Sequence, residues 1–259
     1  MGNGFDIAAK DYDQDFTNSR IGTLQRKQVY QYLNKYVFHK KRLNLLEVNC
    51  GTGEDALWFA QQGHNVMATD ASGEMISVAK TKNDLQNVEF QQLKIQELNQ
   101  LETEGSFDLI FSNFGGLNCL GNDGFSDFLK QSKRLLKTDG KLILVLMPKN
   151  CLWDNFYLFL KGKWNHLGRR NTAEAISINV YGQKVNTWYY NPKDILSLDN
   201  RFKCADYKPI GFFVPPSYTE SFFKNKEVLL NCLGWLDKYT TRLSFLSRFS
   251  DHYIIYLKV

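Results

Sequence analysis

The amino-acid sequence predicts a doubly wound α/β domain, in which helices cover both faces of a mostly parallel sheet. Short apolar runs that resemble buried strands alternate along the chain with segments of helical periodicity. The run at 43–48 is followed by a glycine-containing turn and a helical pattern, and the next strand ends at the acid Asp70. With 259 residues, 43% of them hydrophobic and 23% charged, the chain has an ordinary globular composition, and one elaborated domain is expected.

The central element is a strand, a turn and a helix within residues 43–60. The apolar residues of 43–48 predict a buried strand, whereas the following residues, 49–53, cannot stay extended. Gly51 and Gly53 allow positive φ angles and leave no β-carbon between the backbone and a ligand. A helical pattern begins at Glu54, and the free amides of a helix start favour a polar or anionic ligand.

Two classes of cofactor use such a turn. Gly51, Gly53 and Ala56 also satisfy the Gly-x-Gly-x-x-Gly/Ala pattern of dinucleotide-binding proteins, so an NAD(P)-dependent oxidoreductase is one alternative. Glu47, two positions before the turn, would repel a pyrophosphate and attract a cationic ligand. Two unit charges about 4 Å apart attract by roughly 4 kcal/mol at an effective dielectric constant of about 20. Asp70 lies about twenty residues further on, where a carboxylate can hold the ribose hydroxyls of a nucleotide.

These residues resemble the nucleotide loop of the class I S-adenosylmethionine-dependent methyltransferases. That loop reads acid–apolar–Gly–x–Gly–x–Gly, and the matching positions here run from Glu47 to Gly53, with Asn49 in place of the first glycine. Asparagine tolerates the left-handed region well, so we interpret Asn49 as an accepted variant with a positive φ. Residues 107–113, 134–144 and 251–257 are similar to the fourth strand, the helix–turn–fifth strand and the last strand of the family.

The resemblance implies a seven-stranded, Rossmann-like methyltransferase sheet with an antiparallel last strand. It also implies S-adenosyl-L-methionine as cofactor and methyl transfer to an O, N or C nucleophile of a small molecule. No Pro-Pro-aromatic sequence follows the fourth strand, which argues against amino groups of nucleic acids or proteins as acceptors. A non-catalytic nucleotide-binding module is a second alternative. The residues expected to bind the cofactor are Tyr12, Glu47, Asn49, Cys50, Gly51, Gly53, Asp70, Ala71, Met75, Lys94, Ile95, Asn113 and Phe114.

The adenine end of the predicted site is the part with most alternatives. Ala71 and Met75 follow the ribose acid and are expected to line the adenine, although a methionine at helical spacing is often plain core. The family often places an acid after the third strand, but that position is Lys94 here. We therefore expect the adenine to be held by the backbone near Lys94 and Ile95, or by Gln96.

The methyl end of the predicted site lies where the fourth strand ends. Asn113 and Phe114 follow that strand, and ligands bind beyond the carboxyl ends of strands in open α/β sheets. The glycines at 115–116 either shape the site or form a simple flexible turn. Tyr12 either caps the cofactor or packs the N-terminal segment onto the sheet. No catalytic residue is identified, and His166 is not assigned that role.

The remaining segments predict a cap and two insertions. Residues 1–40 form the N-terminal cap with a helix at 24–38, and residues 43–148 form the cofactor-binding half. The insertion at 149–190 contains a hairpin and a basic connector, either a solvated loop or a site for an anionic acceptor. The insertion at 215–250 has apolar and basic residues at 218–249, which cover the sheet, form a dimer face or lie on a membrane surface. We expect both insertions to form an acceptor-side lid, separate from the cofactor site.

Composition excludes several other classes. The net charge of +5 is mild and unfocused, so no nucleic-acid partner is expected. Five scattered cysteines form no paired motif, and with four isolated histidines no metal site is predicted. No apolar run approaches the roughly 20 residues of a membrane span, and no signal peptide is seen, so a reducing cytoplasm is expected.

Overall fold

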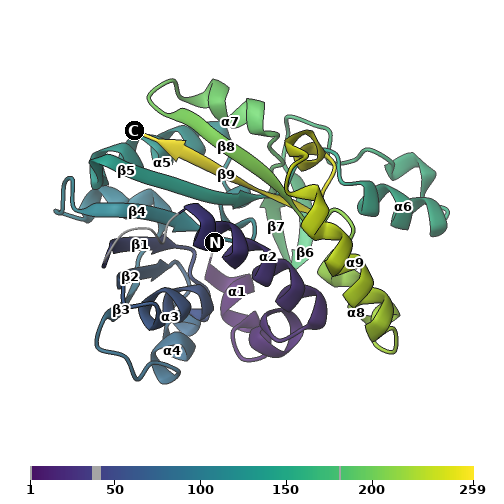
Figure 1. Ribbon diagram of the computed structural model, residues 1–259, viewed down its shortest axis with the longest axis horizontal. Coiled ribbons are helices and arrows are strands. Elements are labelled where there is room, and N and C mark those ends of the chain that lie inside the picture. The colour runs from purple at the N-terminus through teal and green to yellow at the C-terminus, as the bar shows by residue number, and fades with distance from the viewer. Residues whose placement is uncertain (1, 37–41, 181) are drawn as a thin grey trace.

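The computed structural model describes residues 2–36, 42–180 and 182–259, and its centre is a seven-stranded sheet (Figure 1). The strand order is β3-β2-β1-β4-β5-β9-β8. The strands are β1 (Asn44–Val48), β2 (Asn65–Asp70), β3 (Val88–Gln92), β4 (Phe107–Ser112), β5 (Leu136–Leu146), β8 (Lys203–Ile210) and β9 (His252–Lys258). The first five strands are parallel, and β9 is antiparallel to both β5 and β8. The predicted doubly wound sheet with an antiparallel last strand is therefore confirmed.

Helices connect the strands and form the two insertions. They are α1 (Gly2–Ala8), α2 (Arg20–Tyr36), α3 (Glu54–Gln61), α4 (Gly73–Thr81), α5 (Asn122–Leu135), α6 (Leu152–Leu160), α7 (Pro192–Leu198), α8 (Glu220–Phe223) and α9 (Glu227–Thr240). Short helical turns are η1 (Asp13–Thr17), η2 (Ile95–Gln100), η3 (Gly116–Cys119), η4 (Trp164–His166), η5 (Ser217–Thr219) and η6 (Ser244–Arg248). A separate hairpin consists of β6 (Ile176–Val180) and β7 (Gln183–Thr187).

Both faces of the sheet are buried, which explains why its strands have continuous apolar runs. Side chains alternate between the two faces, so that Leu45 packs with α2 and α3 while Leu46 packs with α5 and α7. The same alternation holds in β5, where Ile143 joins the first cluster and Leu144 joins the second. Two hydrophobic layers thus fix the register of the strands, and the carboxyl ends of the parallel strands carry the polar loops.

Some element boundaries differ from the prediction. The helix predicted at 24–38 begins earlier, at Arg20, and the end of that prediction lies outside the described residues. The turn expected within 134–144, between a helix and the fifth strand, lies inside the bounds of β5, since the pairing with β4 shifts between Leu136 and Lys141 and the intervening residues bulge out. The sequence predicts a strand at 202–214 before the second insertion, but β8 ends at Ile210. The carboxylate of Asp237 accepts the backbone N–H groups of 212–214 and draws them out of the sheet.

The N-terminal segment and the insertions lie around the carboxyl ends of the strands. Helix α1 packs against α4, where Ala8, Ala9 and Met75 form a small cluster, and it also contacts the β6–β7 hairpin. In Figure 1, the hairpin lies beyond the end of β5, while α6, α8 and α9 lie further to the right. Helix α9 packs against α2. Among the helices that the structure describes, none combines the length and apolar character needed to cross a membrane.

Candidate functional site

The turn after β1 has the backbone conformation that the sequence predicts. Asn49 has a φ of 56°, and Gly51 and Gly53 have φ values of 54° and 81°. The side chain of Asn49 donates from Nδ2 to Oγ of Ser112, at 3.0 Å, and so ties the turn to the end of β4. A β-carbon at Gly116 would lie 2.6 Å from Cγ of Asn49, so the asparagine occupies space that this glycine leaves open. The positive φ expected for Asn49 is confirmed.

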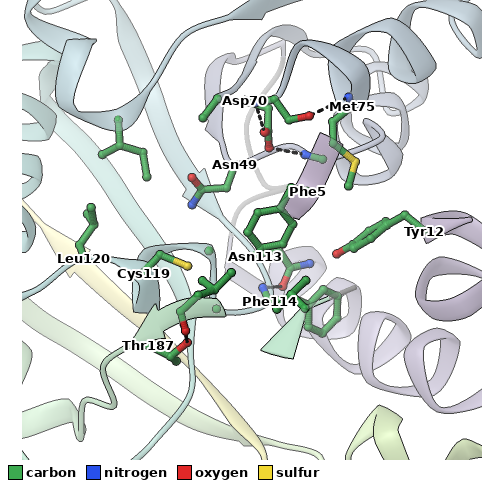
Figure 2. A pocket seen from close by; sticks show the side chains of 18 of the residues that line it. Phe5, Tyr12, Asn49, Asp70, Met75, Asn113, Phe114, Cys119, Leu120 and Thr187 are labelled. Atoms are coloured by element: carbon green, nitrogen blue, oxygen red, sulfur yellow. Dashed lines mark hydrogen bonds between the residues drawn. The ribbon is translucent and has the colours of Figure 1, made fainter. Parts of the chain in front are cut away.

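Asp70 lies at the end of β2 and holds the same turn from the other side. Its Oδ2 accepts the amide of Gly51 and its Oδ1 accepts the amide of Ser72, both at 2.9 Å (Figure 2). Burial raises the pKa of Asp70, although the amide donors oppose this shift. A carboxylate offers about four acceptor positions, so about two remain for a ligand.

The turn after β1 and Asp70 both line a cavity of about 260 Å³, here called the first cavity. Figure 2 shows Asp70 and Met75 on one side of it, Tyr12 and Phe114 on another, and Thr187 and Leu120 across from Asp70. Among the residues predicted to bind the cofactor, those that line this cavity are Tyr12, Asn49, Gly51, Asp70, Ala71, Met75, Ile95, Asn113 and Phe114. Gln96, the alternative for the adenine end, also lines it. The structure thus brings together most of the predicted residues in one place.

Four residues on that list do not line the cavity: Glu47, Cys50, Gly53 and Lys94. Glu47 was expected beside a ligand, but it lies buried below the turn, because β1 continues through the core of the sheet. Burial and the nearby charge of Asp55 raise its pKa well above the usual range, so a direct attraction to a cation is not what the geometry shows. Lys94 has an exposed side chain with Nζ 3.4 Å from Oε1 of Glu97.

Cys50 and Gly53 instead contribute to the packing of the turn against the core. The side chain of Cys50 is buried in the core cluster, and its amide donates to the carbonyl of Thr69 at 3.0 Å. A β-carbon at Gly53 would lie 2.6 Å from the ring of Phe90. Glycine is therefore required at position 53 by the packing of the turn against β3, and not by the approach of a ligand.

The end of β4 is held by buried polar contacts. Nδ2 of Asn113 donates to Oδ2 of Asp55 at 3.0 Å. Oδ1 of Asp55 accepts from Nε of Arg26 at 3.1 Å and from the hydroxyl of Tyr30 at 2.7 Å. Phe114, with a φ of 46°, is held in the left-handed region that bulky residues avoid. Helices α2 and α3 thus determine where Asn113 and Phe114 lie.

Phe114 forms part of a wall between the first cavity and a larger second cavity of about 720 Å³. Residues that line both cavities are Tyr12, Phe114, Met147, Ile178 and Val180. The ring of Phe114 lies 5.1 Å from the ring of Phe16 and 5.5 Å from that of His252, both of which line the second cavity. Other residues of the second cavity are Asp15, Arg169, Arg170, Ser177, Asn179, Tyr189, Pro216, Ser217, Tyr218 and Asp251.

The basic connector of the first insertion is not a uniformly solvated loop. Asp154 is buried and accepts two hydrogen bonds from Arg169, at 2.8 and 3.0 Å, and one from the hydroxyl of Tyr218, at 3.1 Å. Arg170 is also buried, with Nε 3.3 Å from Oδ2 of Asp154 and its guanidinium over the ring of Tyr189. Burial raises the pKa of Asp154, but the contacts with Arg169 and Arg170 outweigh it and the net shift is downward. This network joins the two insertions at the second cavity.

His252 begins β9 and lines the second cavity beside Asp251. Its Nδ1 lies 3.1 Å from Oδ2 of Asp251, but outside hydrogen-bond geometry. Oδ2 of Asp251 accepts a hydrogen bond from Gln25 at 3.1 Å. Burial raises the pKa of Asp251, but the nearby His252 and Arg170 lower it by more. The net shift of the Asp251 pKa is therefore downward. His166, by contrast, is exposed and lines neither cavity.

The expected separation between cofactor site and acceptor-side lid is only partly seen. The β6–β7 hairpin of the first insertion lines the first cavity with Ile178, Val180, Val185 and Thr187, and so is not confined to an acceptor side. Helix α9 lines neither cavity, because its covered side packs against α2 and the loop after β8. Phe5 of α1 also lines the first cavity, although the sequence offered no signal for it.

In the parts of the chain that the structure describes, no three His, Cys, Asp or Glu side chains are placed to hold a metal ion.

Comparisons with known proteins show which family this chain is similar to. Residues 45–140 match the family model described as a methyltransferase domain. The malonyl-[acyl-carrier protein] O-methyltransferase of Bacillus anthracis is 31% identical over 124 residues, which are 45% of this chain and 42% of that protein. The chain spans less than half the length of the curated relatives that it matches.

Solved structures extend the likeness to nearly the whole chain. An S-adenosylmethionine-dependent methyltransferase from Mesorhizobium loti has a TM-score of 0.58 at 12% identity, covering 91% of this chain and 100% of that one. The 1,6-didemethyltoxoflavin-N1-methyltransferase of Burkholderia thailandensis, with 1,6-didemethyltoxoflavin and S-adenosylhomocysteine bound, has a TM-score of 0.55 at 15% identity. It covers 97% of this chain and 84% of its own. At these identities the likeness is one of fold.

Proposed function

Because the chain contains a class I S-adenosylmethionine-dependent methyltransferase domain, we propose that it transfers a methyl group from S-adenosylmethionine to a small-molecule nucleophile. One observation carries this proposal. The first cavity, which contains the glycine turn and Asp70, shares the wall around Phe114 with a larger second cavity. A cofactor in the first cavity and an acceptor in the second would meet at that wall.

The residues of the first cavity fit the parts of this cofactor. Asp70 has acceptor positions left for the two ribose hydroxyls after holding Gly51 and Ser72. Met75 and Ile95 supply apolar surface for the adenine. A β-carbon at Gly51 would meet only Tyr12, at 3.8 Å, so the backbone of the turn is open to a ligand on that side. We assign these residues to cofactor binding on this basis.

Bound S-adenosylmethionine supplies a methyl group on a positively charged sulfur, which is already an activated leaving group. The protein has to orient the acceptor and exclude water, and orientation of this kind contributes roughly 7–11 kcal/mol. The wall residues Tyr12, Phe114 and Met147, together with the β6–β7 hairpin, supply an apolar boundary for both tasks. Asn49 and Asn113, tied to Ser112 and Asp55, hold the end of β4 in position.

His252 is the side chain that we assign as proton acceptor, for an acceptor molecule that must lose a proton. It lines the second cavity and packs edge-on against the wall residue Phe114. The carboxylate of Asp251, 3.1 Å from Nδ1, would stabilise the imidazolium that forms. A proton acceptor of this kind increases the reaction rate about 10²- to 10⁴-fold.

Calorimetric titration of the protein with S-adenosylmethionine, S-adenosylhomocysteine and NADH tests the cofactor assignment. We expect the first two to bind and NADH not to bind; the reverse result would support the oxidoreductase alternative and overturn the proposal. Fractionated metabolite extracts are then assayed for S-adenosylhomocysteine release to find the acceptor. Binding without release in any fraction would support a non-catalytic module.

Once an acceptor is found, His252→Asn tests the proton acceptor, and His166→Asn is a matched control on an exposed histidine outside both cavities. We expect His252→Asn to lower turnover about 10²-fold or more and to remove the rise of turnover with pH, with unchanged affinity for S-adenosylmethionine. Equal turnover and pH dependence in the two variants would contradict the role of His252.

A further inference from the structure

Helix α9 is apolar on the side that faces away from the protein. Its inner side includes the buried Leu230, which packs in a cluster with residues of α2 and α8. Val228, Cys232, Trp235 and Tyr239 follow one another at spacings of four, three and four residues, which places them on one outer stripe. All four are exposed, with exposed fractions of 78% for Val228, 54% for Trp235 and 61% for Tyr239. Only one of the two apolar sides of α9 is therefore covered by the described parts of this chain.

Helices α6 and α8 also carry exposed aromatic residues. Trp153 of α6 packs against Phe223 of α8, with ring centres 6.4 Å apart, and against Phe156, at 6.1 Å. Phe156, Phe222 and Trp164 are themselves exposed, the last two by 64% and 66%. In Figure 1, α6 projects from the body of the molecule on the same side as α8 and α9. We call the outer stripe of α9 and the exposed aromatic residues of α6, η4 and α8 the aromatic edge.

Basic side chains occur in the same segments of the chain as the aromatic edge. They are Lys161, Lys163, Lys224, Lys226, Lys238, Arg242 and Arg248. No carboxylate of the described residues forms an ion pair with any of them. Nζ of Lys226 lies 3.2 Å from the centre of the Phe222 ring, and Nζ of Lys161 lies 5.7 Å from that of Tyr157. Lysine stems that run along aromatic rings with a charged end are typical of an apolar–aqueous boundary.

Acids in the same segments do not neutralise these charges, because each is used elsewhere. Glu220 accepts the backbone amides at 20 and 21, at the start of α2. Glu227 pairs with Arg20. Asp237 is buried and accepts the three backbone amides of 212–214. The aromatic edge is therefore a positively charged apolar surface.

We propose that the aromatic edge binds the surface of an anionic lipid bilayer. Tryptophan and tyrosine rings have an apolar body and a polar tip and lie well at the level of lipid headgroups. The lysines and arginines around them would contact anionic headgroups, as in basic amphipathic helices at membrane interfaces. This inference is independent of methyl transfer, since α9 lines neither cavity.

A second copy of the chain is a less suitable occupant of this surface. A twofold interface places the same patch on both subunits, so the basic residues of one copy would face those of the other. A rigid protein partner would need pockets for several side chains that protrude more than half exposed from projecting helices. A fluid bilayer surface accepts such side chains without preformed pockets.

Co-sedimentation of the full chain with lipid vesicles tests the proposal. Vesicles of equal parts phosphatidylglycerol and phosphatidylcholine are compared with vesicles of phosphatidylcholine alone. We expect partitioning about tenfold or more stronger onto the anionic vesicles, reduced when sodium chloride is raised to about 0.5 M, because salt screens exposed charges. Trp235→Ser combined with Tyr239→Ser, and separately Lys238→Glu, should each weaken binding severalfold. Lys130→Glu, the same charge change on the exposed side of α5, is the matched control and should weaken binding less.

All variants change exposed residues, and thermal melts together with S-adenosylmethionine titrations verify that they stay folded. Failure to bind vesicles of either composition would overturn the lipid proposal. Equal weakening by Lys238→Glu and Lys130→Glu would reduce the effect to net charge and would also overturn it. If sedimentation velocity shows a dimer, and Trp235→Ser dissociates it, the surface binds a second copy of the chain and the lipid proposal is overturned. None of these results depends on whether the protein transfers methyl groups.

Discussion

Replacement of Asp70 separates the two roles that the structure suggests for this carboxylate. Oδ2 accepts the amide of Gly51 and Oδ1 that of Ser72, and the remaining acceptor positions face the first cavity. Asp70→Asn keeps one acceptor oxygen and turns an amide group toward one of the two backbone donors. Asp70→Ala removes both acceptors. The two substitutions therefore disturb the turn to different extents, while both remove the charge expected to hold the ribose.

The magnitude follows from the bonds lost. A hydrogen bond to a charged group contributes about 1.5–3 kcal/mol, so the loss of the ribose contacts should weaken S-adenosylmethionine binding at least about tenfold. A similar loss at the backbone amides lowers the free energy of unfolding. For a domain somewhat smaller than this one, about 1 kcal/mol shifts the melting temperature by roughly 2–4 °C. We therefore expect Asp70→Ala to melt several degrees lower, and Asp70→Asn to melt between it and the original protein.

Isothermal titration with S-adenosylmethionine well below the melting temperature measures the ribose contribution, and thermal melts measure the contribution to the turn. Glu89→Ala is the matched control, since Glu89 is an exposed acid on the neighbouring strand β3. Unchanged cofactor affinity in a folded Asp70→Ala protein would refute the ribose assignment. Unchanged melting in both variants would refute the role of Asp70 in holding the turn.

Three further predictions follow from other positions. Asn49→Gly should bind S-adenosylmethionine with an affinity within about threefold of that of the original protein. Asn49→Val should lose binding, because a β-branched residue is strained at a φ of 56°. Equal affinity in both variants would contradict the conformation of the turn. Asp237→Asn should lower the free energy of unfolding by about 1–3 kcal/mol, since its amide group cannot accept hydrogen bonds from all three N–H groups of 212–214. An unchanged melting temperature would show that these hydrogen bonds do not stabilise the protein. Asp154 and Asp251 have pKa values below the ordinary value of about 3.9, so their stabilisation is complete above about pH 4 and is lost as the pH falls through their folded-state pKa values. The melting temperature should fall below about pH 4, and less steeply in Asp154→Asn; parallel pH profiles would contradict this linkage.

The sequence alone was sufficient for the sheet and for the centre of the first cavity, because the signals there are local. Two-sided burial of β1 and β5 produces continuous apolar runs, and positive φ angles in the turn select glycine or asparagine at positions 49, 51 and 53. Asp70 ends the next strand, and parallel pairing of β1 with β2 is enough to bring it beside the turn. These features depend on neighbours in the chain or in the next strand.

Only the tertiary structure determined which residues face a cavity. Glu47 lies beside the turn in sequence, but the course of β1 through the core buries it below the turn. Thr187 and Phe5 reach the first cavity because the hairpin and α1 pack against each other, far apart in sequence. Arg170 is buried by Asp154 and Tyr189, although its segment has the composition of a solvated loop.

The clearest case is helix α9, whose apolar residues leave open whether they cover the sheet, form a dimer face or lie on a membrane surface. The structure covers the side of Leu230 and leaves that of Trp235 exposed. Periodicity determines which residues share a face of a helix, because backbone geometry is local. What covers that face depends on contacts between segments distant in sequence, or on surfaces outside the chain, and no local pattern contains that information.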